Sequence, residues 1–249
     1  MLNGKVAIVT GSTNGIGFAI ARRLAQDGGH VLVSSRKQKN VDAAVEQLKK
    51  EGLSVSGIVC HVGKEEDRKR LVTKALEEYG KIDILVCNAA VNPFVGPILE
   101  TTESIWEKVF QVNVISTFLM IKLVVPHLQK QGYGSIIICS SAASYLPLSP
   151  IGPYSVSKAA LLCLTKVMAD SLRPMNIRVN GLVLGLINTT FSEKIRMIPE
   201  IHLKLASFGI YRLGKPEECG GIVSFLCSED ASYINGENIG VTGGIVGRL

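Results

Sequence analysis

The sequence lacks the cysteine spacing that marks metal-binding and disulfide-rich proteins. Six cysteines are present among 249 residues, but they form no Cys-x-x-Cys pair and no Cys/His ligand pattern. Several of them lie in apolar segments, where free thiols are commonly buried. We therefore interpret the cysteines, at positions 60, 87, 139, 163, 219 and 227, as reduced thiols of an intracellular protein that has no metal site.

The sequence also gives no sign of a secretory leader or a membrane-spanning segment. The apolar segment Val6–Thr10 follows Met1 closely, and no charged leader with an apolar core precedes it. No uninterrupted apolar run reaches the roughly 18 residues that a membrane-spanning helix needs. We expect a soluble, unsecreted chain without a membrane span.

Charge of one sign is not concentrated in any segment. The 27 Lys and Arg residues and 21 Asp and Glu residues give a formal net charge of +6. Basic pairs such as Lys49–Lys50 fall on predicted solvated helix faces, so we expect no nucleic-acid partner. Because the chain also has no linker, internal repeat or low-complexity segment, we expect one domain over residues 1–249.

The sequence does contain a pair of residues suited to proton transfer, Tyr154 and Lys158, with Ser141 thirteen residues before the tyrosine. Residues four apart share one face of a helix, so the Lys158 ammonium can lie near the Tyr154 phenol and stabilise its anion. An ordinary phenol has a pKa of about 10, and a neighbouring cation moves that pKa toward the working pH of a general acid or base. The pattern predicts a catalytic tyrosine, although Tyr and Lys also meet at this spacing by chance in many helices.

A second motif stands near the N-terminus, in KVAIVTGSTNGIGFAIARRLAQDG. It predicts a buried strand, Val6–Thr10, then a glycine-punctuated turn, then an amphipathic helix from about Gly15. Glycines allow the backbone to approach a ligand closely, and the free N–H groups of a helix N-terminus attract an anion. The spacing is TGxxxGxG rather than GxGxxG, and a purely structural turn is the alternative. The predicted pyrophosphate site comprises Gly11, Ser12, Thr13, Asn14, Gly15, Ile16 and Gly17.

Strand-like and helix-like segments alternate along the rest of the chain. After the first strand, the predicted strands are His30–Ser35, Val55–Cys60, Ile84–Asn88, Ser135–Ser140, Arg178–Val183 and Ile239–Thr242. The predicted helices between them are Val41–Glu51, Glu65–Tyr79, Glu103–Gln129, Tyr154–Leu172 and Glu217–Cys227, with a further helical segment near Phe191–Ala206. Such alternation predicts an α/β fold, a Rossmann-type doubly wound parallel sheet with helices on both faces.

Residues that follow the predicted strands converge on one edge of this sheet. Gly11, Ser35, Asn88 and Ser141 all lie at the carboxyl ends of strands, where ligands bind in such folds. Residues distant in sequence are therefore expected to line one crevice.

The segment after the second strand, Val33–Lys37, bears on the choice of nicotinamide coenzyme. An NAD enzyme generally places an acidic residue here to bind the ribose hydroxyls, whereas an arginine accommodates the 2′-phosphate of NADP. This segment has no carboxylate, Ser35 can donate a hydrogen bond, and Arg36 carries a planar, permanently charged guanidinium. The composition favours NADP(H), and a basic solvated loop is the alternative.

These motifs, in this order, resemble the short-chain dehydrogenase/reductase family along the whole chain. TGSTNGIG at 10–17 is similar to the family's cofactor turn, and Asn88–Ala89–Ala90 resembles its NAG motif. The residues at the positions of the family's catalytic tetrad are Asn113, Ser141, Tyr154 and Lys158.

The resemblance implies a role for each member of this tetrad. In carbonyl reduction, Tyr154 donates a proton to the carbonyl oxygen and Ser141 hydrogen-bonds the same oxygen. Lys158 also holds the nicotinamide ribose, and Asn113 helps organise a proton relay through water. The alternatives are structural: Asn113 satisfies a break in a helix, and Ser141 caps a strand end.

Further cofactor contacts follow from the same resemblance, at Lys37, His61, Val62, Asn88, Ala89, Ile187 and Thr189. His61 stands where many relatives have an acidic residue near the adenine, so a surface or packing role is the alternative. Where the family usually has Pro-Gly after the sixth strand, this chain has Leu184–Gly185. Loss of the proline frees the turn but removes no reacting group.

The family keeps a mobile substrate lid where this chain has residues near 188–212. The lid segment Phe191–Tyr211 is rich in Phe, Ile, Met and Leu, which suits a small lipophilic carbonyl or alcohol, although a core helix has a similar composition. The stretches SSRKQKNVD, VCHVGKEEDR, NAAVNP and IVSFLCSEDASYI are similar to the family's branch of peroxisomal, NADP-dependent retinol dehydrogenases/reductases. This implies retinal, aromatic dicarbonyls or steroid ketones as substrates.

Two other functions stay open from the sequence. One is 3-oxoacyl thioester reduction, which uses the same chemistry. The other is a non-catalytic NADP-binding sensor or interaction protein, against which the intact tetrad argues.

Assembly and location are also implied by likeness. Family members commonly form tetramers through helices that correspond to Glu103–Gln129 and Tyr154–Leu172, so we expect a homotetramer. The tripeptide Gly247–Arg248–Leu249 is close to the S-K-L peroxisomal address but has glycine in place of serine. We expect the peroxisome, with the cytosol or mitochondrion as alternatives.

Overall fold

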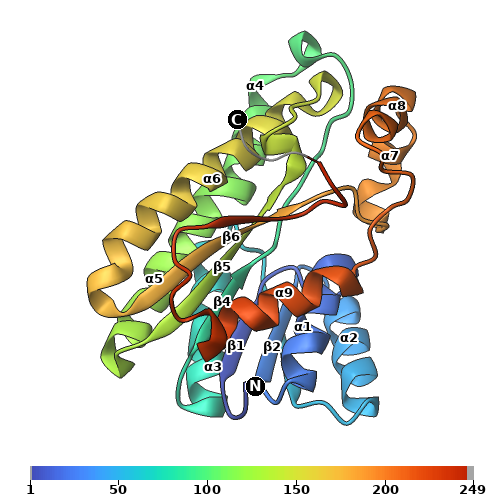
Figure 1. Ribbon diagram of the computed structural model, residues 1–249. Coiled ribbons are helices and arrows are strands. Elements are labelled where there is room, and N and C mark those ends of the chain that lie inside the picture. Colours follow the sequence, from blue (N-terminus) through green and yellow to red (C-terminus); the bar gives the residue numbers. More distant parts are fainter. Residues whose placement is uncertain (1, 246–249) are drawn as a thin grey trace.

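Seven parallel strands form one sheet in the computed structural model, which describes residues 2–245 (Figure 1). The strands are β1 (Val6–Val9), β2 (His30–Ser35), β3 (Val55–Val59), β4 (Ile84–Cys87), β5 (Gly134–Ser141), β6 (Ile177–Leu184) and β7 (Asn238–Val241). Their order in the sheet is β3-β2-β1-β4-β5-β6-β7. The predicted strands are confirmed, and their boundaries differ by no more than one residue at either end.

Helices cover both faces of this sheet and confirm the Rossmann-type prediction (Figure 1). The helices are α1 (Gly15–Gln26), α2 (Gln38–Lys50), α3 (Glu65–Tyr79), α4 (Glu103–Phe110), α5 (Ser116–Gln131), α6 (Gly152–Leu172), α7 (Glu193–Arg196), α8 (Pro199–Ser207) and α9 (Glu217–Cys227). Helix α2 begins three residues before the predicted start because its first residues, Gln38, Lys39 and Asn40, carry no apolar side chain that periodicity could detect.

The alternation of side chains along β1 divides the core into two layers. Ala7 and Val9 pack in a cluster with residues of α1 and α9, such as Leu24 and Val223. Ile8 points to the other face, where residues of α3, α5 and α6 pack. All three β1 side chains are fully buried. Continuous apolar strands are thus explained by burial on both faces.

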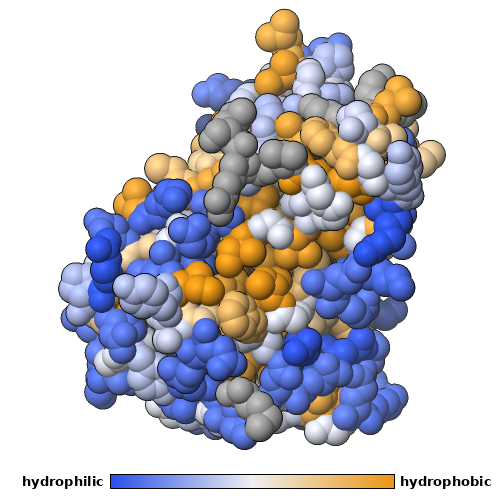
Figure 2. All heavy atoms as spheres, viewed as in Figure 1, coloured by the Kyte–Doolittle hydropathy of each residue, from blue (hydrophilic) through white to orange (hydrophobic). Residues whose placement is uncertain are grey.

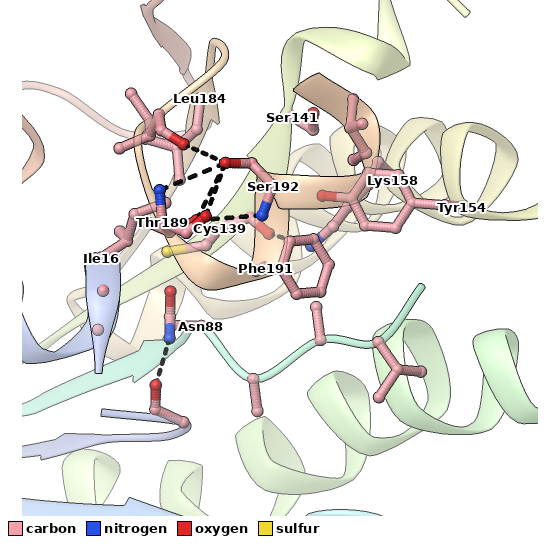
Figure 3. A pocket seen from close by; sticks show the side chains of 18 of the residues that line it. Ile16, Asn88, Cys139, Ser141, Tyr154, Lys158, Leu184, Thr189, Phe191 and Ser192 are labelled. Atoms are coloured by element: carbon pink, nitrogen blue, oxygen red, sulfur yellow. Dashed lines mark hydrogen bonds between the residues drawn. The ribbon is translucent and has the colours of Figure 1, made fainter. Parts of the chain in front are cut away.

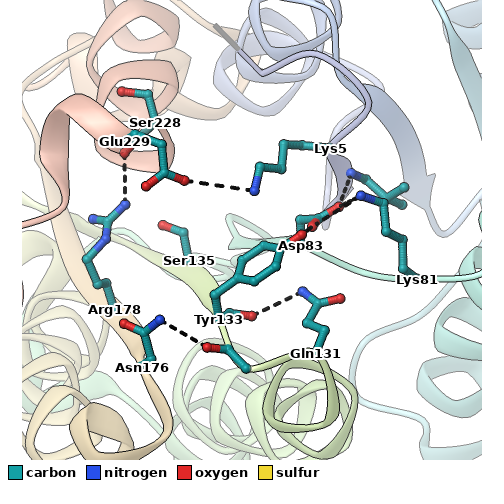
Figure 4. Close-up of polar contacts among 12 residues, drawn as sticks. Lys5, Lys81, Asp83, Gln131, Tyr133, Ser135, Asn176, Arg178, Ser228 and Glu229 are labelled. Carbon is teal, nitrogen blue, oxygen red and sulfur yellow. Dashed lines mark hydrogen bonds and ion pairs between the residues drawn. The ribbon is translucent and has the colours of Figure 1, made fainter.

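A buried carboxylate ties the amino ends of the strands together (Figure 4). Asp83 accepts hydrogen bonds from the Val6 backbone N–H (2.7 Å) and from the Tyr133 hydroxyl (2.6 Å), and it pairs with Lys81 (3.1 Å). The hydrogen bond to Asp83 raises the pKa of Tyr133 to about 12, and burial adds to this effect. Because these polar contacts lie opposite the carboxyl ends, they stabilise the scaffold without taking part in the crevice.

The predicted helix Glu103–Gln129 is not one regular α-helix. A π-helical turn, Gln111–Ile115, separates α4 from α5, and its widened turn contains Asn113. The Ser116 and Thr117 hydroxyls donate to the backbone carbonyls of Val112 (2.6 Å) and Asn113 (2.8 Å). A single inserted residue barely disturbs the apolar pattern, so the sequence could not reveal this turn.

One helix bears on the expectation that the chain has no membrane span. The combined helical segment Glu103–Gln131 is long and apolar enough to cross a membrane, by length and composition alone. Its most apolar 18-residue window has a mean hydropathy of 1.7. A window mean can be high even when polar residues are interspersed, whereas the prediction from the sequence considered only uninterrupted apolar runs. The window is 44% buried inside the structure, and α5 packs against α3, β4 and β5, as a core helix of this sheet does.

The segment predicted as one helix near Phe191–Ala206 is instead divided. A short 3-10 turn, Thr190–Ser192, leads into α7, and α8 begins at Pro199. A proline disfavours helical backbone in the residue before it, which explains the break after α7. Ile187 and Gly214 pair as a β-bridge at the base of this segment. The tripeptide Gly247–Leu249 lies outside the described residues.

Candidate active site

The carboxyl ends of the strands open into a cavity of about 510 Å³. It lies where the strand order reverses, between β1 and β4, which is the usual ligand crevice of an open α/β sheet. Most of the predicted site residues line it: Gly11, Thr13, Asn14, Gly15, Ile16, Gly17, Ser35, Arg36, Lys37, His61, Val62, Asn88, Ala89, Ser141, Tyr154, Lys158, Ile187 and Thr189. Ser12 and Asn113 are not among the lining residues.

The two predicted residues outside the lining hold the walls of the cavity. The Ser12 hydroxyl donates to Val9 C=O (2.6 Å) and accepts from the Ser34 N–H (2.9 Å), so it joins the ends of β1 and β2. The Asn113 side chain accepts from the Val91 N–H (2.8 Å) and donates to Val91 C=O (3.0 Å). Both side chains are buried and fully engaged by the protein.

The glycine-rich turn is shaped so that no side chain fits at its centre. Gly11 and Gly15 adopt left-handed backbone conformations, with φ of 61° and 56°. A Cβ on Gly17 would lie 2.4 Å from Gly11 C=O and 2.5 Å from the Asn88 amide nitrogen. That amide donates to the carbonyls of Thr10 (3.0 Å) and Gly11 (2.9 Å), which fixes the turn against the end of β4.

The start of α1 offers the features of an anion site. Asn14 is the N-cap, and its side chain accepts from the Gly15 N–H at 2.7 Å. No acidic residue stands in the first turn of the helix, so its dipole is not offset by a carboxylate. The turn therefore fits the pyrophosphate of a dinucleotide.

Polar side chains at the carboxyl end of β2 have no hydrogen-bond or ion-pair partner among the described residues. The Ser35 hydroxyl is buried and has no hydrogen-bond partner among the described residues. Arg36 and Lys37 are exposed at the cavity wall and form no ion pair within the part of the chain that the structure describes. An unpaired buried hydroxyl beside two free cations fits a phosphorylated ribose.

His61 lines the same end of the cavity but is already engaged by the protein. Its ring nitrogen Nδ1 accepts from the Gly63 N–H (3.1 Å), and its backbone N–H donates to Asp67 (2.8 Å). Burial lowers the pKa of His61, and the nearby Lys108 and Arg36 lower it further. The imidazole is therefore neutral at physiological pH and serves as a hydrogen-bond acceptor.

Tyr154, Lys158 and Ser141 meet at the centre of the cavity (Figure 3). Tyr154 and Lys158 lie one turn apart on α6, and Ser141 is the last residue of β5. The Lys158 ammonium lies 5.5 Å from the centroid of the Tyr154 ring and donates to Cys139 C=O at 2.8 Å. The predicted proximity of these three side chains is confirmed.

The direction of the Tyr154 pKa shift differs from the one expected from the sequence. Burial raises the pKa of Tyr154 to about 12, and the hydrogen bond with Ser141 only partly opposes this effect. Burial also lowers the pKa of Lys158 to about 8. Desolvation therefore sets the direction of both shifts, which the spacing alone could not reveal. A phenol that stays protonated at neutral pH is suited to donate a proton.

Asn113 reaches this centre through a second serine. Its amide nitrogen donates to the Ser157 hydroxyl (3.0 Å), and that hydroxyl donates to Tyr154 C=O (2.7 Å). Ser157 is fully buried. Asn113 thus links the Val91 backbone to α6 through Ser157, so its side chain does not satisfy the break in its own helix. The water relay implied by the resemblance stays a prediction.

Apolar side chains close the far side of the cavity. Those in the predicted lid segment Phe191–Tyr211 were expected from its composition, whereas Leu146, Leu148 and Ile151 were not anticipated. The apolar side chains come from the loop between Ser141 and Tyr154 and from the segment that contains α7 and α8: Leu146, Leu148, Ile151, Leu186, Phe191, Ile195, Ile201, Leu205 and Phe208. Figure 2 shows apolar side chains gathered in the hollow beneath α7 and α8. For Leu146 and Leu148 the available signal was the apolar run Tyr145–Leu148, which lies between Ser141 and Tyr154 in the sequence.

Comparisons with known proteins agree with this arrangement. A family profile described as "Enoyl-(Acyl carrier protein) reductase" matches residues 11–246. The mouse (Mus musculus) protein "Dehydrogenase/reductase SDR family member 4" is 60% identical over 253 residues, covering 100% of this chain and 89% of the mouse protein. The human (Homo sapiens) protein of the same name is 59% identical over 249 residues, covering 100% of this chain and 90% of the human protein.

A solved structure is similar in fold along the whole chain. It is described as "7 alpha-hydroxysteroid dehydrogenase complexed with NADH and 7-oxo glycochenodeoxycholic acid". The two chains share 34% identity with a TM-score of 0.92, covering 100% of this chain and 96% of the other. That protein binds a nicotinamide dinucleotide and a steroid ketone, and its fold is that of the present sheet.

Proposed function

Because this chain belongs to the short-chain dehydrogenase/reductase family, we propose that it is an NADPH-dependent reductase of lipophilic ketones and aldehydes. The reaction is reversible, so the same site oxidises the corresponding alcohols. The observation that carries the proposal is the meeting of Ser141, Tyr154 and Lys158 in a cavity whose other walls are a dinucleotide cradle and an apolar surface.

The coenzyme fits the cradle through groups that the protein leaves without partners. The glycine turn and the α1 N-terminus would hold the pyrophosphate, and Ser35, Arg36 and Lys37 would hold the 2′-phosphate of NADP. The absence of a carboxylate from Val33–Lys37 supports NADP over NAD, since no like charge repels the phosphate. When bound, the coenzyme supplies the hydride that reaches the carbonyl carbon.

The protein's own part in the reaction is to bind the carbonyl oxygen and deliver a proton to it. Tyr154 is protonated at neutral pH, as a phenol with a pKa of about 10 or above is, and burial raises its pKa to about 12. Its hydroxyl donates the proton as negative charge develops on the oxygen, and the Ser141 hydroxyl stabilises the same charge. Lys158 is held toward the cavity by its bond to Cys139 C=O and would bind the ribose hydroxyls.

The substrate half of the cavity supports a neutral, apolar substrate. Its lining is aliphatic and aromatic, and Lys158 is the one cation among the described lining residues outside the coenzyme end. We propose that residues 188–212 act as a substrate lid over this half. Retinal, aromatic dicarbonyls and steroid ketones satisfy these requirements, and the similar structure noted above contains a steroid ketone.

A second candidate is reduction of an acyl thioester, which the description of the matching family profile favours. Such a substrate carries a phosphopantetheine arm, and its phosphate needs a cation near the substrate entrance. Apart from Lys158, the described lining residues of the substrate half include no cation. We therefore place the lipophilic carbonyl first.

A substrate panel separates these functions. NADPH consumption should be measured with retinal, an aromatic α-dicarbonyl, a steroid ketone and acetoacetyl thioester. Turnover of the first three with weak use of the thioester is the expected result. Turnover of the thioester alone would support the second candidate, and no turnover at all would support a non-catalytic NADP-binding protein.

Assembly as a homotetramer is part of the proposal. Ile115, Phe118, Val156 and Val167 are apolar, lie in or beside α5 and α6, and are each more than two-fifths exposed. Burial of such side chains against another copy would remove them from water. Light scattering at micromolar concentration tests this, since a monomer mass would contradict it.

Peroxisomal targeting by Gly247–Leu249 also stays a proposal, and microscopy of cells that express the chain with and without Leu249 would test it.

A further inference from the structure

Phe191 contacts the ring of the proposed proton donor, Tyr154. The ring centroids lie 5.8 Å apart, and the ring planes are inclined by 49°. This separation falls within the range of about 4.5–7 Å for direct contact between aromatic rings, so no third ring fits between them. Figure 3 shows Phe191 beside Tyr154 and Lys158 at the centre of the cavity.

The turn that carries Phe191 is held in place on both sides. Thr189 and Ser192 form a capping box around it, and the buried Ser192 hydroxyl donates to Ile187 C=O at 2.6 Å. From the coenzyme side, the Asn14 amide donates to the Thr190 hydroxyl at 3.3 Å. The backbone of Phe191 is therefore held in place by the turn, and the contact with Tyr154 helps to orient its ring.

Much of the Phe191 side chain is left uncovered by the protein. Tyr154 covers part of the side chain, but 44% of Phe191 remains exposed, and the residue lines the cavity. The other lining residues of the substrate half are mostly aliphatic. Phe208 is the exception, and no ring contact joins it to Tyr154 among the described residues. Phe191 is thus the aromatic surface next to the reacting phenol.

We propose that Phe191 is a specificity-determining residue that favours carbonyls with a planar aryl or conjugated substituent. This inference rests on the reductase activity proposed above. A carbonyl oxygen that reaches the Tyr154 hydroxyl would bring its substituents within reach of the exposed part of Phe191, which lines the same cavity. Planar groups gain an aromatic contact there that saturated groups of similar size do not.

The test compares acetophenone with cyclohexyl methyl ketone, which differ in the planarity of one six-carbon ring. The ratio of their kcat/KM values with NADPH should be measured for the wild type, Phe191→Leu, Phe191→Tyr and Phe208→Leu. Comparison of this ratio between variants cancels the difference in intrinsic reactivity. We expect Phe191→Leu to lower the aryl-to-cyclohexyl ratio about 2- to 10-fold, as loss of an aromatic contact predicts.

The other variants serve as controls. Phe191→Tyr retains the ring and should keep the ratio within about twofold of wild type, and Phe208→Leu should do the same. NADPH affinity, measured by fluorescence titration, should change little in Phe191→Leu. The inference is overturned by an unchanged ratio in Phe191→Leu, by an equal loss in Phe208→Leu, by failure of Phe191→Tyr to keep the ratio, or by a loss confined to NADPH affinity. If the wild type reduces neither ketone but reduces other carbonyls, Phe191 does not select the planar group; if it reduces no carbonyl, the proposed function itself fails.

Discussion

Replacing Arg36 by alanine should weaken NADPH binding and leave NADH binding nearly unchanged. The structure leaves the Arg36 side chain exposed at the cavity wall, next to the buried, unpaired Ser35 hydroxyl. A hydrogen bond to a charged group contributes about 1.5–3 kcal/mol. Because Arg36 is exposed, we take the lower end, about 1.5 kcal/mol, which corresponds to roughly a tenfold rise in the KM for NADPH.

A matched control separates phosphate binding from general charge. Lys39→Ala removes the same charge three residues away, from an exposed position outside the cavity lining, and should leave both KM values within about twofold. Ser35→Asp should lower NADPH use further, because its carboxylate would face the phosphate, and it should improve NADH use. Steady-state kinetics with both coenzymes give the kcat/KM ratio. An unchanged ratio in Arg36→Ala and Ser35→Asp would refute the phosphate assignment.

Two further predictions concern the lysine and the glycine turn. Burial lowers the pKa of Lys158 to about 8, so its ammonium loses its proton as the pH rises through 8. The kcat/KM for NADPH should therefore be constant below about pH 7 and fall above about pH 8. A constant value up to about pH 10 would contradict the lowered pKa. Gly17→Ala should lower the free energy of unfolding by about 1–3 kcal/mol and abolish NADPH binding, because the new Cβ would overlap Gly11 C=O. Thermal denaturation and fluorescence titration measure both effects. Gly221→Ala is the control, since its Cβ would meet only the flexible end of Arg23, and an equal loss there would contradict the steric explanation.

The sheet could be predicted closely because each strand is a short apolar run flanked by polar residues or glycine. Ala7, Ile8 and Val9 are all buried, as a parallel sheet covered on both faces requires. The convergence of residues at the strand ends followed from the same topology. The sequence could not show the π-helical turn at Gln111–Ile115, because periodicity averages over a one-residue insertion.

The pKa shifts at the site were harder to predict from the sequence than the identity of the residues that form it. The spacing of Tyr154 and Lys158 placed the two side chains together, but the sign of the Tyr154 pKa shift depends on burial, which is a property of the whole fold. The part of the apolar wall that lies outside the predicted lid was missed for the same reason. Leu146 and Leu148 lie in an irregular loop, and only the tertiary structure turns them toward the cavity.

The role of Tyr154 as proton donor is the most direct test of the proposed function. Tyr154→Phe removes the hydroxyl but retains the ring and its contact with Phe191. NADPH-dependent reduction of a lipophilic ketone should be compared between wild type and Tyr154→Phe, with NADPH affinity measured in parallel. We predict that kcat falls at least 10²-fold, within the roughly 10²–10⁴-fold range of general acid catalysis, while NADPH affinity is nearly unchanged. Turnover by Tyr154→Phe at a rate near that of wild type would contradict the assignment.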